Sequence, residues 1–177
     1  MANSKEELKL IRMNEVEATA INWLWYPYIP FGKITVIQGD PGDGKTTVVL
    51  AIAAALTTGA ALPESTAAAE PMTVIFQTAE DGLGDTVKPR LVQSGADCSR
   101  VIVIDESEKE LSLSDVRVEQ AIMQTGAKMF ILDPLQAYLG ADVDMHRANE
   151  ISVIPHTRST SISARQAKKP LMTKSCA

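Results

Sequence analysis

The chain has 177 residues, 45% of them hydrophobic and 22% charged, which suits one domain with a substantial buried core. Its net charge of −5 gives no overall electrostatic reason to expect a nucleic-acid or anionic-membrane partner, although it does not exclude a local basic groove. The two cysteines form no disulfide framework, the first residues lack an apolar secretory signal, and the longest apolar run, residues 48–56, is too short to span a membrane, so we expect a cytoplasmic location and no membrane.

The first half of the chain predicts a strand, a buried helix and a second strand. Residues 33–38 (KITVIQ) are apolar and β-branched, as expected for a buried strand. Residues 45–58 (KTTVVLAIAAALTT) are apolar on almost every side, which favours a helix buried on several sides, and Gly59 ends it. The Ala-rich residues 61–71 favour a surface loop, and residues 72–77 (MTVIFQ) predict the second strand.

The second half continues the alternation of helices and strands. Residues 86–94 predict a short helix, and residues 101–104 (VIVI) predict a third strand. Ser114 is the expected N-cap of a helix over residues 115–125. Residues 128–132 (KMFIL) predict a fourth strand.

Short apolar strands that alternate with helices predict an α/β fold with a mainly parallel sheet flanked by helices on both faces, and with right-handed crossovers. We expect this core over residues 1–150. The composition changes abruptly near Glu150, because residues 151–177 contain no acidic residue but five basic ones and show no helical or strand period. We therefore expect a basic Ser/Thr-rich tail that is disordered or loosely attached.

The most specific pattern follows the first predicted strand, where GDPGDGKT matches G-x-x-x-x-G-K-[ST] in full. The glycines let backbone amides converge on phosphates, and the following helix presents its N-terminal amides and dipole to the same anion. Lys45 is expected to reach the β- and γ-phosphates and the Thr46 hydroxyl to ligate Mg²⁺, so ATP and Mg²⁺ are the expected ligands. Asp40 and Asp43 are compatible with a bound anion only if their side chains point away from it. The expected nucleotide-binding residues are Gly39, Asp40, Pro41, Gly42, Asp43, Gly44, Lys45, Thr46 and Thr47.

Carboxylates that follow two predicted strands supply the groups that hydrolysis needs. Asp133 follows MFIL, the pattern of a second Walker motif, so we expect it to hold Mg²⁺ together with Thr46; the alternative is a cap after a buried strand. Glu80 follows MTVIFQ at the carboxyl end of a strand, the ligand side of a parallel sheet. We favour Glu80 over the adjacent Asp81 as general base, with a solvated acidic loop as the alternative. Gln136, just past Asp133, could sense the γ-phosphate through its amide or could equally have no such role.

In motif order, the chain resembles the RecA-like ATPases of the replicative hexameric helicase group, the RepA-type plasmid and phage helicases, and the wider AAA-family ATPases of mobile elements. The matching segments are residues 23–47, 74–91 and 126–150. The resemblance implies a RecA-like P-loop NTPase fold and ATP hydrolysis in homo-oligomeric, hexameric rings, often coupled to movement on single-stranded DNA. It also implies Lys45 and Glu80 as catalytic residues and Asp133 as the second Walker aspartate. It further implies a position for Arg90 near the base of the nucleotide.

The chain departs from the family after residue 150. Relatives of this type continue into a further core strand, a phosphate-sensing histidine, DNA-facing loops and an arginine finger, and residues 151–177 show none of these patterns. His156 comes too early and follows no strand, so the sensor role is not carried onto it. We expect a reading-frame shift near Glu150 that leaves an incomplete ATPase core.

Three functions remain open on the sequence: an ATPase motor of the helicase type, a nucleotide-binding module with little turnover, and, less favoured, a small-molecule kinase. The kinase ranks last because no lid or acceptor site is evident. The aromatic residues between positions 23 and 28 could stack a base, but we prefer a packed entry segment that covers the sheet edge.

Overall fold

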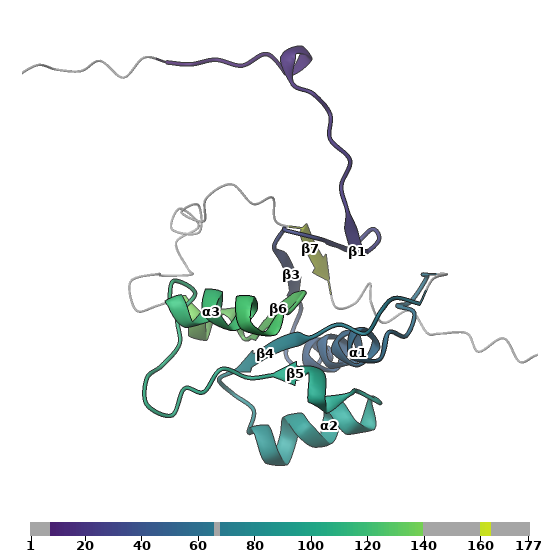
Figure 1. Ribbon diagram of the computed structural model, residues 1–177, viewed down its shortest axis with the longest axis vertical. Coiled ribbons are helices and arrows are strands. Elements are labelled where there is room, and N and C mark those ends of the chain that lie inside the picture. The colour runs from purple at the N-terminus through teal and green to yellow at the C-terminus, as the bar shows by residue number, and fades with distance from the viewer. Residues whose placement is uncertain (1–7, 66–67, 140–159, 164–177) are drawn as a thin grey trace, which may run out of the picture.

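Three parallel strands form the centre of the computed structural model, which describes residues 8–65, 68–139 and 160–163 (Figure 1). Their order is β5 (Val101–Ile102), β4 (Val74–Thr78), β6 (Met129–Asp133). β4 pairs with β6 along its whole length, from Val74↔Met129 to Thr78↔Asp133, but with β5 over only two residues. Valine, isoleucine and phenylalanine fill these strands because their branched or flat side chains pack well on a pleated surface covered on both sides.

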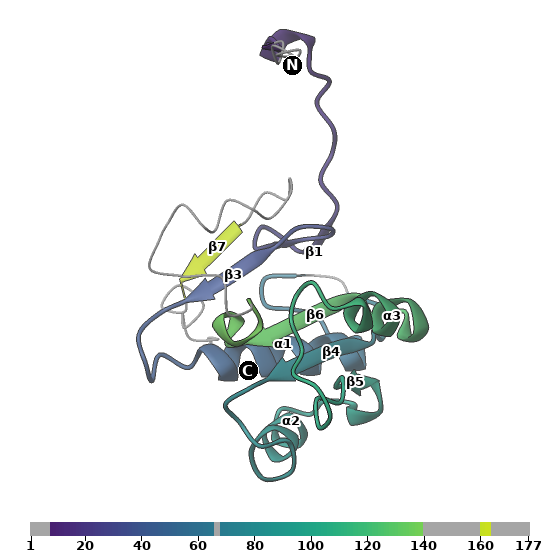
Figure 2. The ribbon, with the colours of Figure 1, turned by 90° about the vertical axis from the view of Figure 1, so that its left-hand side faces the viewer.

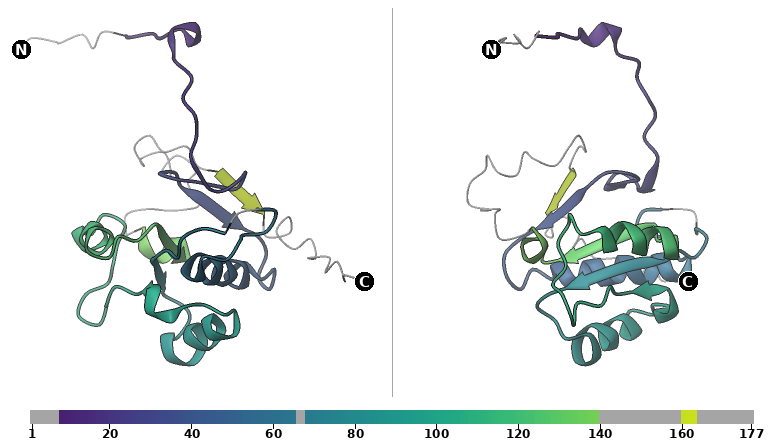
Figure 3. Two further views of the ribbon diagram at one scale, coloured as in Figure 1. Left: turned by 45° about the vertical axis from the view of Figure 1, so that its right-hand side comes forward. Right: turned by 60° about the vertical axis from the view of Figure 1, so that its left-hand side comes forward.

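Helices cover both faces of this sheet, as the sequence predicts. α1 (Lys45–Thr58) and α2 (Lys88–Gln93) lie on one face, and α3 (Val116–Thr125) lies on the other (Figure 3). A π-helical segment, Leu83–Val87, runs directly into α2. The predicted helix over residues 86–94 is therefore one part of a longer helical segment. The α/β class and the flanking helices are confirmed.

Two hydrophobic clusters follow from the alternation of side chains along the strands. On the α1 face, Leu50 and Leu56 pack with Phe76 and Ile131. On the α3 face, Leu111, Val118 and Tyr138 form a second cluster, with partly buried Ile104, Phe130 and Leu132 against it. The α1 face holds most of the core, because α1 is apolar on nearly every side and α3 is amphipathic.

The strand before the glycine-rich loop, β3 (Thr35–Gln38), belongs to a different ladder. Within the described ranges it pairs in parallel with β7 (Thr160–Ser163), and it has no ladder partner among β4, β5 and β6. The sequence predicts no strand in the basic tail, so β7 is a finding of the structure. The rest of that tail, including His156, lies outside the described residues.

A small antiparallel hairpin precedes β3. It comprises β1 (Trp23–Trp25) and β2 (Ile29–Pro30). Trp25 is buried in the main core and its indole nitrogen donates to the carbonyl of Pro63 at 2.8 Å. Tyr26 is exposed, so the preferred interpretation of a packed entry segment holds for the inward side of the hairpin only.

Short helical turns complete the described chain: three 3₁₀ turns at Met13–Glu15, Cys98–Arg100 and Leu135–Tyr138. The predicted N-cap of α3, Ser114, is wrong by one residue. The Asp115 carboxylate accepts from the Arg117 amide at 2.9 Å and caps the helix instead, because a carboxylate also meets the positive end of the helix dipole. No helix in the described part of the chain is both long enough and apolar enough to cross a membrane.

Candidate nucleotide site

The glycine-rich loop connects β3 to the first turn of α1 (Figure 2). Gly42 and Gly44 have φ angles of +83° and +80°, a left-handed conformation that costs a glycine little and any other residue more. Gly44 is also the N-cap of α1, and its carbonyl accepts from the Val48 amide at 3.0 Å. The loop therefore bends sharply into a helix whose first amides point towards the bend.

The side chain of Lys45 folds back into this bend. Its ammonium donates to the carbonyls of Gly39 and Asp40, each at 3.0 Å. The carboxylate of Asp43 accepts from the Asp40 amide at 3.0 Å, so it is engaged with the loop's own backbone. These carbonyl oxygens carry no formal charge and so do not neutralise the ammonium, which suits an anionic ligand.

The loop and the end of β6 meet through a direct hydrogen bond. The Thr46 hydroxyl donates to the Asp133 carboxylate at 2.7 Å, across 87 positions of the sequence. Both groups are oxygen ligands of the kind that Mg²⁺ prefers. Among the described residues, no three Asp, Glu, His or Cys side chains gather around one point. This pair fits a magnesium ion that keeps water and substrate phosphate as its remaining ligands, as is common for this metal.

Glu80 lies in the turn that follows β4, beside the end of β6. The register pairs Thr78 with Asp133, and the Ala79 amide donates to the Asp133 carbonyl at 3.4 Å. Asp133 is the last residue of β6 and Glu80 comes just after β4, so both lie at the carboxyl ends of neighbouring parallel strands. The Glu80 side chain is exposed to solvent, where it can meet water.

Contacts on both sides of Glu80 fix this turn. The Asp81 amide donates to the Thr78 hydroxyl at 3.2 Å, and the Asp81 carboxylate pairs with Arg90 on α2 at 3.5 Å. The pair engages Asp81, the sequence's competitor for the role of base, as a structural anchor. Arg90, for which the resemblance implies a place near the nucleotide base, is paired with Asp81 in the acidic turn.

The structure also contains a buried polar network that the sequence analysis did not find. The Gln77 amide, 1% exposed, contacts both Ile104 and Glu106. A polar residue at the end of an otherwise apolar strand was the available signal. Gln136, the candidate sensor, is exposed on the turn after β6.

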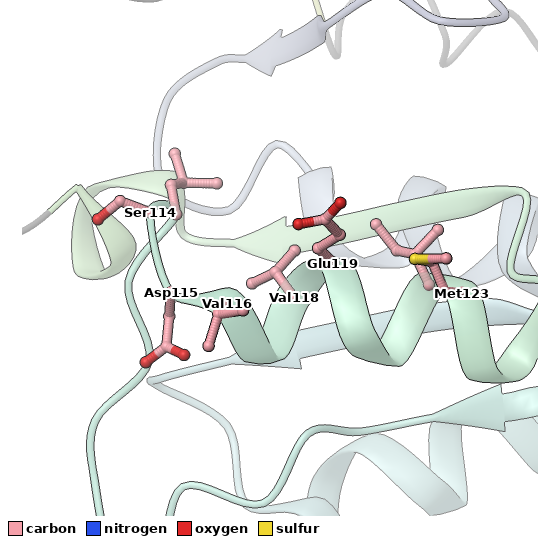
Figure 4. Close-up of a pocket in the computed structure, with 8 residues that line it drawn as sticks. Ser114, Asp115, Val116, Val118, Glu119 and Met123 are labelled. Atoms are coloured by element: carbon pink, nitrogen blue, oxygen red, sulfur yellow. The ribbon is translucent and has the colours of Figure 1, made fainter.

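A surface groove of about 430 Å³ runs along α3 (Figure 4). Its lining residues come from α3 and the segment before it, and none belongs to the glycine-rich loop. The groove is open and partly apolar. The candidate nucleotide site is therefore identified by the hydrogen bonds of Lys45, Thr46 and Asp133, and not by this groove.

Comparison with known proteins agrees with this geometry. A family model described as an AAA domain matches residues 3–164 of the 177. Searches of curated proteins and of solved structures found no match.

Proposed function

Because the chain belongs to the AAA domain family, whose fold and motifs are those of nucleotide-binding ATPases, we propose that it binds ATP with Mg²⁺ at residues 39–47 and hydrolyses it. The observation that carries the proposal is the hydrogen bond between Thr46 and Asp133, which brings the glycine-rich loop and the end of β6 to one point. The Lys45 ammonium folds back onto the same loop, so this loop carries a positive charge as well as the hydroxyl that contacts Asp133.

Each residue has a distinct role in this proposal. Backbone amides of the loop and the Lys45 ammonium bind the phosphates. Thr46 and Asp133 hold the Mg²⁺, which supplies positive charge to the phosphate oxygens when bound. Glu80 accepts a proton from the attacking water. Its place after β4, next to the end of β6, supports this role, because ligands of parallel sheets bind at the carboxyl ends of the strands.

The finer part of the proposal concerns the work that hydrolysis performs. The order of the three motifs resembles that of RepA-type hexameric helicases, which favours a homo-oligomeric ring whose hydrolysis is coupled to single-stranded DNA. The overall charge of −5 means that such DNA contacts must be local. This part rests on resemblance and needs its own measurement.

ATP turnover of the wild type and of Glu80→Gln, each with and without single-stranded DNA, tests both parts. We expect turnover in the wild type, stimulation by DNA, and a loss of at least about 100-fold in Glu80→Gln with ATP binding retained. Glu119→Gln, an exposed carboxylate on α3, is the matched control and should keep full activity.

The outcomes separate the candidate functions. Turnover without DNA stimulation keeps the ATPase and rejects the coupling to DNA. ATP binding without any turnover favours a nucleotide-binding module, and turnover only in the presence of a small-molecule acceptor favours a kinase. Full activity in Glu80→Gln removes Glu80 from the mechanism.

A further inference from the structure

Gln77 is a buried polar side chain near the end of the central strand β4. It is 1% exposed, and the alternation along β4 directs it to the α3 face, opposite to Val74 and Phe76. A buried amide is costly unless its donors and acceptor are satisfied, and the second hydrophobic cluster lies on this same face. The contacts that satisfy this amide therefore show what it does at this place.

Gln77 stands where the ladder between β4 and β5 has ended. The last backbone pair is Ile75↔Ile102, and beyond it the side-chain amide of Gln77 bridges the two segments. Its oxygen accepts from the Ile104 amide at 2.6 Å, and its nitrogen donates to the Ile104 carbonyl at 3.3 Å. The side chain thus replaces the missing ladder bonds and fixes the separation of β4 from the chain after β5.

Glu106 extends this bridge. One of its carboxylate oxygens accepts from the Gln77 amide nitrogen at 2.5 Å, and the other accepts from the Leu111 amide at 3.1 Å. A carboxyl group offers two oxygens for such contacts, whereas a side-chain amide offers one. Glu106 therefore ties β4 to both ends of the loop that follows β5.

That loop is itself firmly held, so it can serve as an anchor. Arg117 donates to the carbonyls of Asp105, Lys109 and Glu110 at 2.9 to 3.2 Å. It also pairs with the Asp115 carboxylate at 3.0 Å. The hydrogen bonds that this carboxylate accepts from the side chain and the backbone amide of Arg117 hold the pKa of Asp115 well below its usual value.

On the other side of Gln77 lies the acidic turn. Thr78 follows immediately, and its hydroxyl accepts from the Asp81 amide. Glu80 lies in the chain between these two residues. Any movement of the end of β4 therefore carries Glu80 with it. On the β6 side that end is held by ladder bonds, whereas on the β5 side the bridge through Gln77 takes their place.

We propose that Gln77, acting with Glu106, is a positioning residue for Glu80: it fixes the end of β4 laterally, so that the candidate base keeps its place beside Asp133. The inference rests on the proposed function, because it gives Gln77 a part in turnover. A purely structural amide would affect folding stability and leave the catalytic step unchanged.

The kinetic test compares Gln77→Met, Glu106→Ala and the double variant with the wild type. We expect kcat to fall roughly tenfold to a hundredfold in each single variant. The Kd for ATP should stay within about twofold of the wild-type value, because the glycine-rich loop lies on another segment. The double variant should be no worse than the worse single one, because the two residues act through one contact. Gln93→Met, an exposed glutamine on α2, is the control and should match the wild type.

An unchanged kcat in Gln77→Met would overturn the inference, as would losses that multiply in the double variant. Glu106 is only half-buried, so Glu106→Ala provides the test if Gln77→Met does not fold.

Hydrogen exchange of the nucleotide-free protein gives a readout that does not depend on turnover. The amides of Ala79 and Asp81 donate to Asp133 and Thr78, and they should exchange faster in either variant than in the wild type. Unchanged exchange in a folded variant rejects the positioning role even if the wild type proves to be active. Faster exchange with an inactive wild type would reject the proposed ATPase and leave the structural coupling standing.

Discussion

Lys45, Thr46 and Asp133 share one property: each is held by a hydrogen bond that a bound ligand can replace. The Lys45 ammonium rests on two loop carbonyls, and Thr46 donates to Asp133. A phosphate would offer the Lys45 ammonium a partner of opposite charge, and a magnesium ion would do the same for the Asp133 carboxylate. In the proposed site these hydrogen bonds already restrict the side chains, which reduces the cost of ordering them on binding.

Tyr138 differs from these three residues, because its polar atom is not held by a hydrogen bond to any described residue. Its side chain is 1% exposed, and its hydroxyl has no hydrogen-bond partner within the described structure. Burial, with the nearby Glu106 carboxylate, raises the pKa of Tyr138 from 10.0 to about 12. The neutral form is therefore favoured in the folded state, and the unfolded chain gains a charge first as the pH rises.

We predict that Tyr138→Phe changes the free energy of unfolding by less than about 1 kcal/mol at pH 8, because no hydrogen bond is lost. The folded pKa is raised, so the contribution of Tyr138 is fully present below pH 10.0 and is lost as the pH rises towards 12. Urea unfolding at pH 8 and pH 11 should show a smaller alkaline loss in the phenylalanine variant. An equal loss in both proteins would mean that the hydroxyl is not shielded from ionisation.

At the scale of elements, α1 connects the loop to the core. Its inward residues pack against β4 and β6, and Gly59 closes its C-terminus in a left-handed conformation with φ of +74°. The amide after it, that of Ala60, donates to the Ala55 carbonyl at 2.9 Å and completes the cap. The position of α1, and hence of Lys45 and Thr46, depends on this packing and on a correct end.

Substitution of Gly59 by alanine should therefore be unusually damaging. A Cβ there would strain the backbone and would collide with the Ala69 carbonyl and with Pro71. We expect a loss of about 2–4 kcal/mol in the free energy of unfolding. Gly126 caps α3 with φ of +64° and has open space around it, so Gly126→Ala should lose only about 1–2 kcal/mol. Similar losses in the two variants would contradict the close approach at Gly59.

The elements differ in how well the sequence predicts them. The bounds of α1 agree with the sequence prediction, because an apolar run followed by glycine is a local signal. The strands β4 and β6 were also found from their apolar runs. The cap of α3 and the π-helical segment before α2 were not predicted. Several adjacent polar or flexible residues could take these positions, and a local pattern does not show which of them does.

The candidate site divides in the same way. The phosphate loop, Glu80 and Asp133 follow from local motifs together with the rule that parallel strands end on one side of a sheet. The pairing of Gln77 with Glu106, 29 positions apart, could not be read from the sequence, because it arises where two strands diverge. The engagement of Asp43 with the loop backbone likewise required coordinates.

For the whole molecule, the site lies where separate layers converge. α1 comes from one face of the sheet, β4 and β6 supply its acidic edge, and β3 delivers the loop from its own ladder (Figures 1 and 2). The Thr46–Asp133 contact joins these parts at the ligand side. The predicted partition into residues 1–150 and a basic tail stays a prediction, since residues 140–159 lie outside the described structure.

The affinity for ATP in the presence of Mg²⁺ tests the central claim most directly, measured by calorimetry for the wild type, Lys45→Ala and Lys128→Ala. Lys128 lies just before β6, at the strand end opposite to Asp133, and serves as the control. We predict that the wild type and Lys128→Ala bind ATP equally well, and that Lys45→Ala binds it at least about tenfold more weakly. Binding that is equal in all three proteins, or absent from the wild type, would contradict a nucleotide site at this loop.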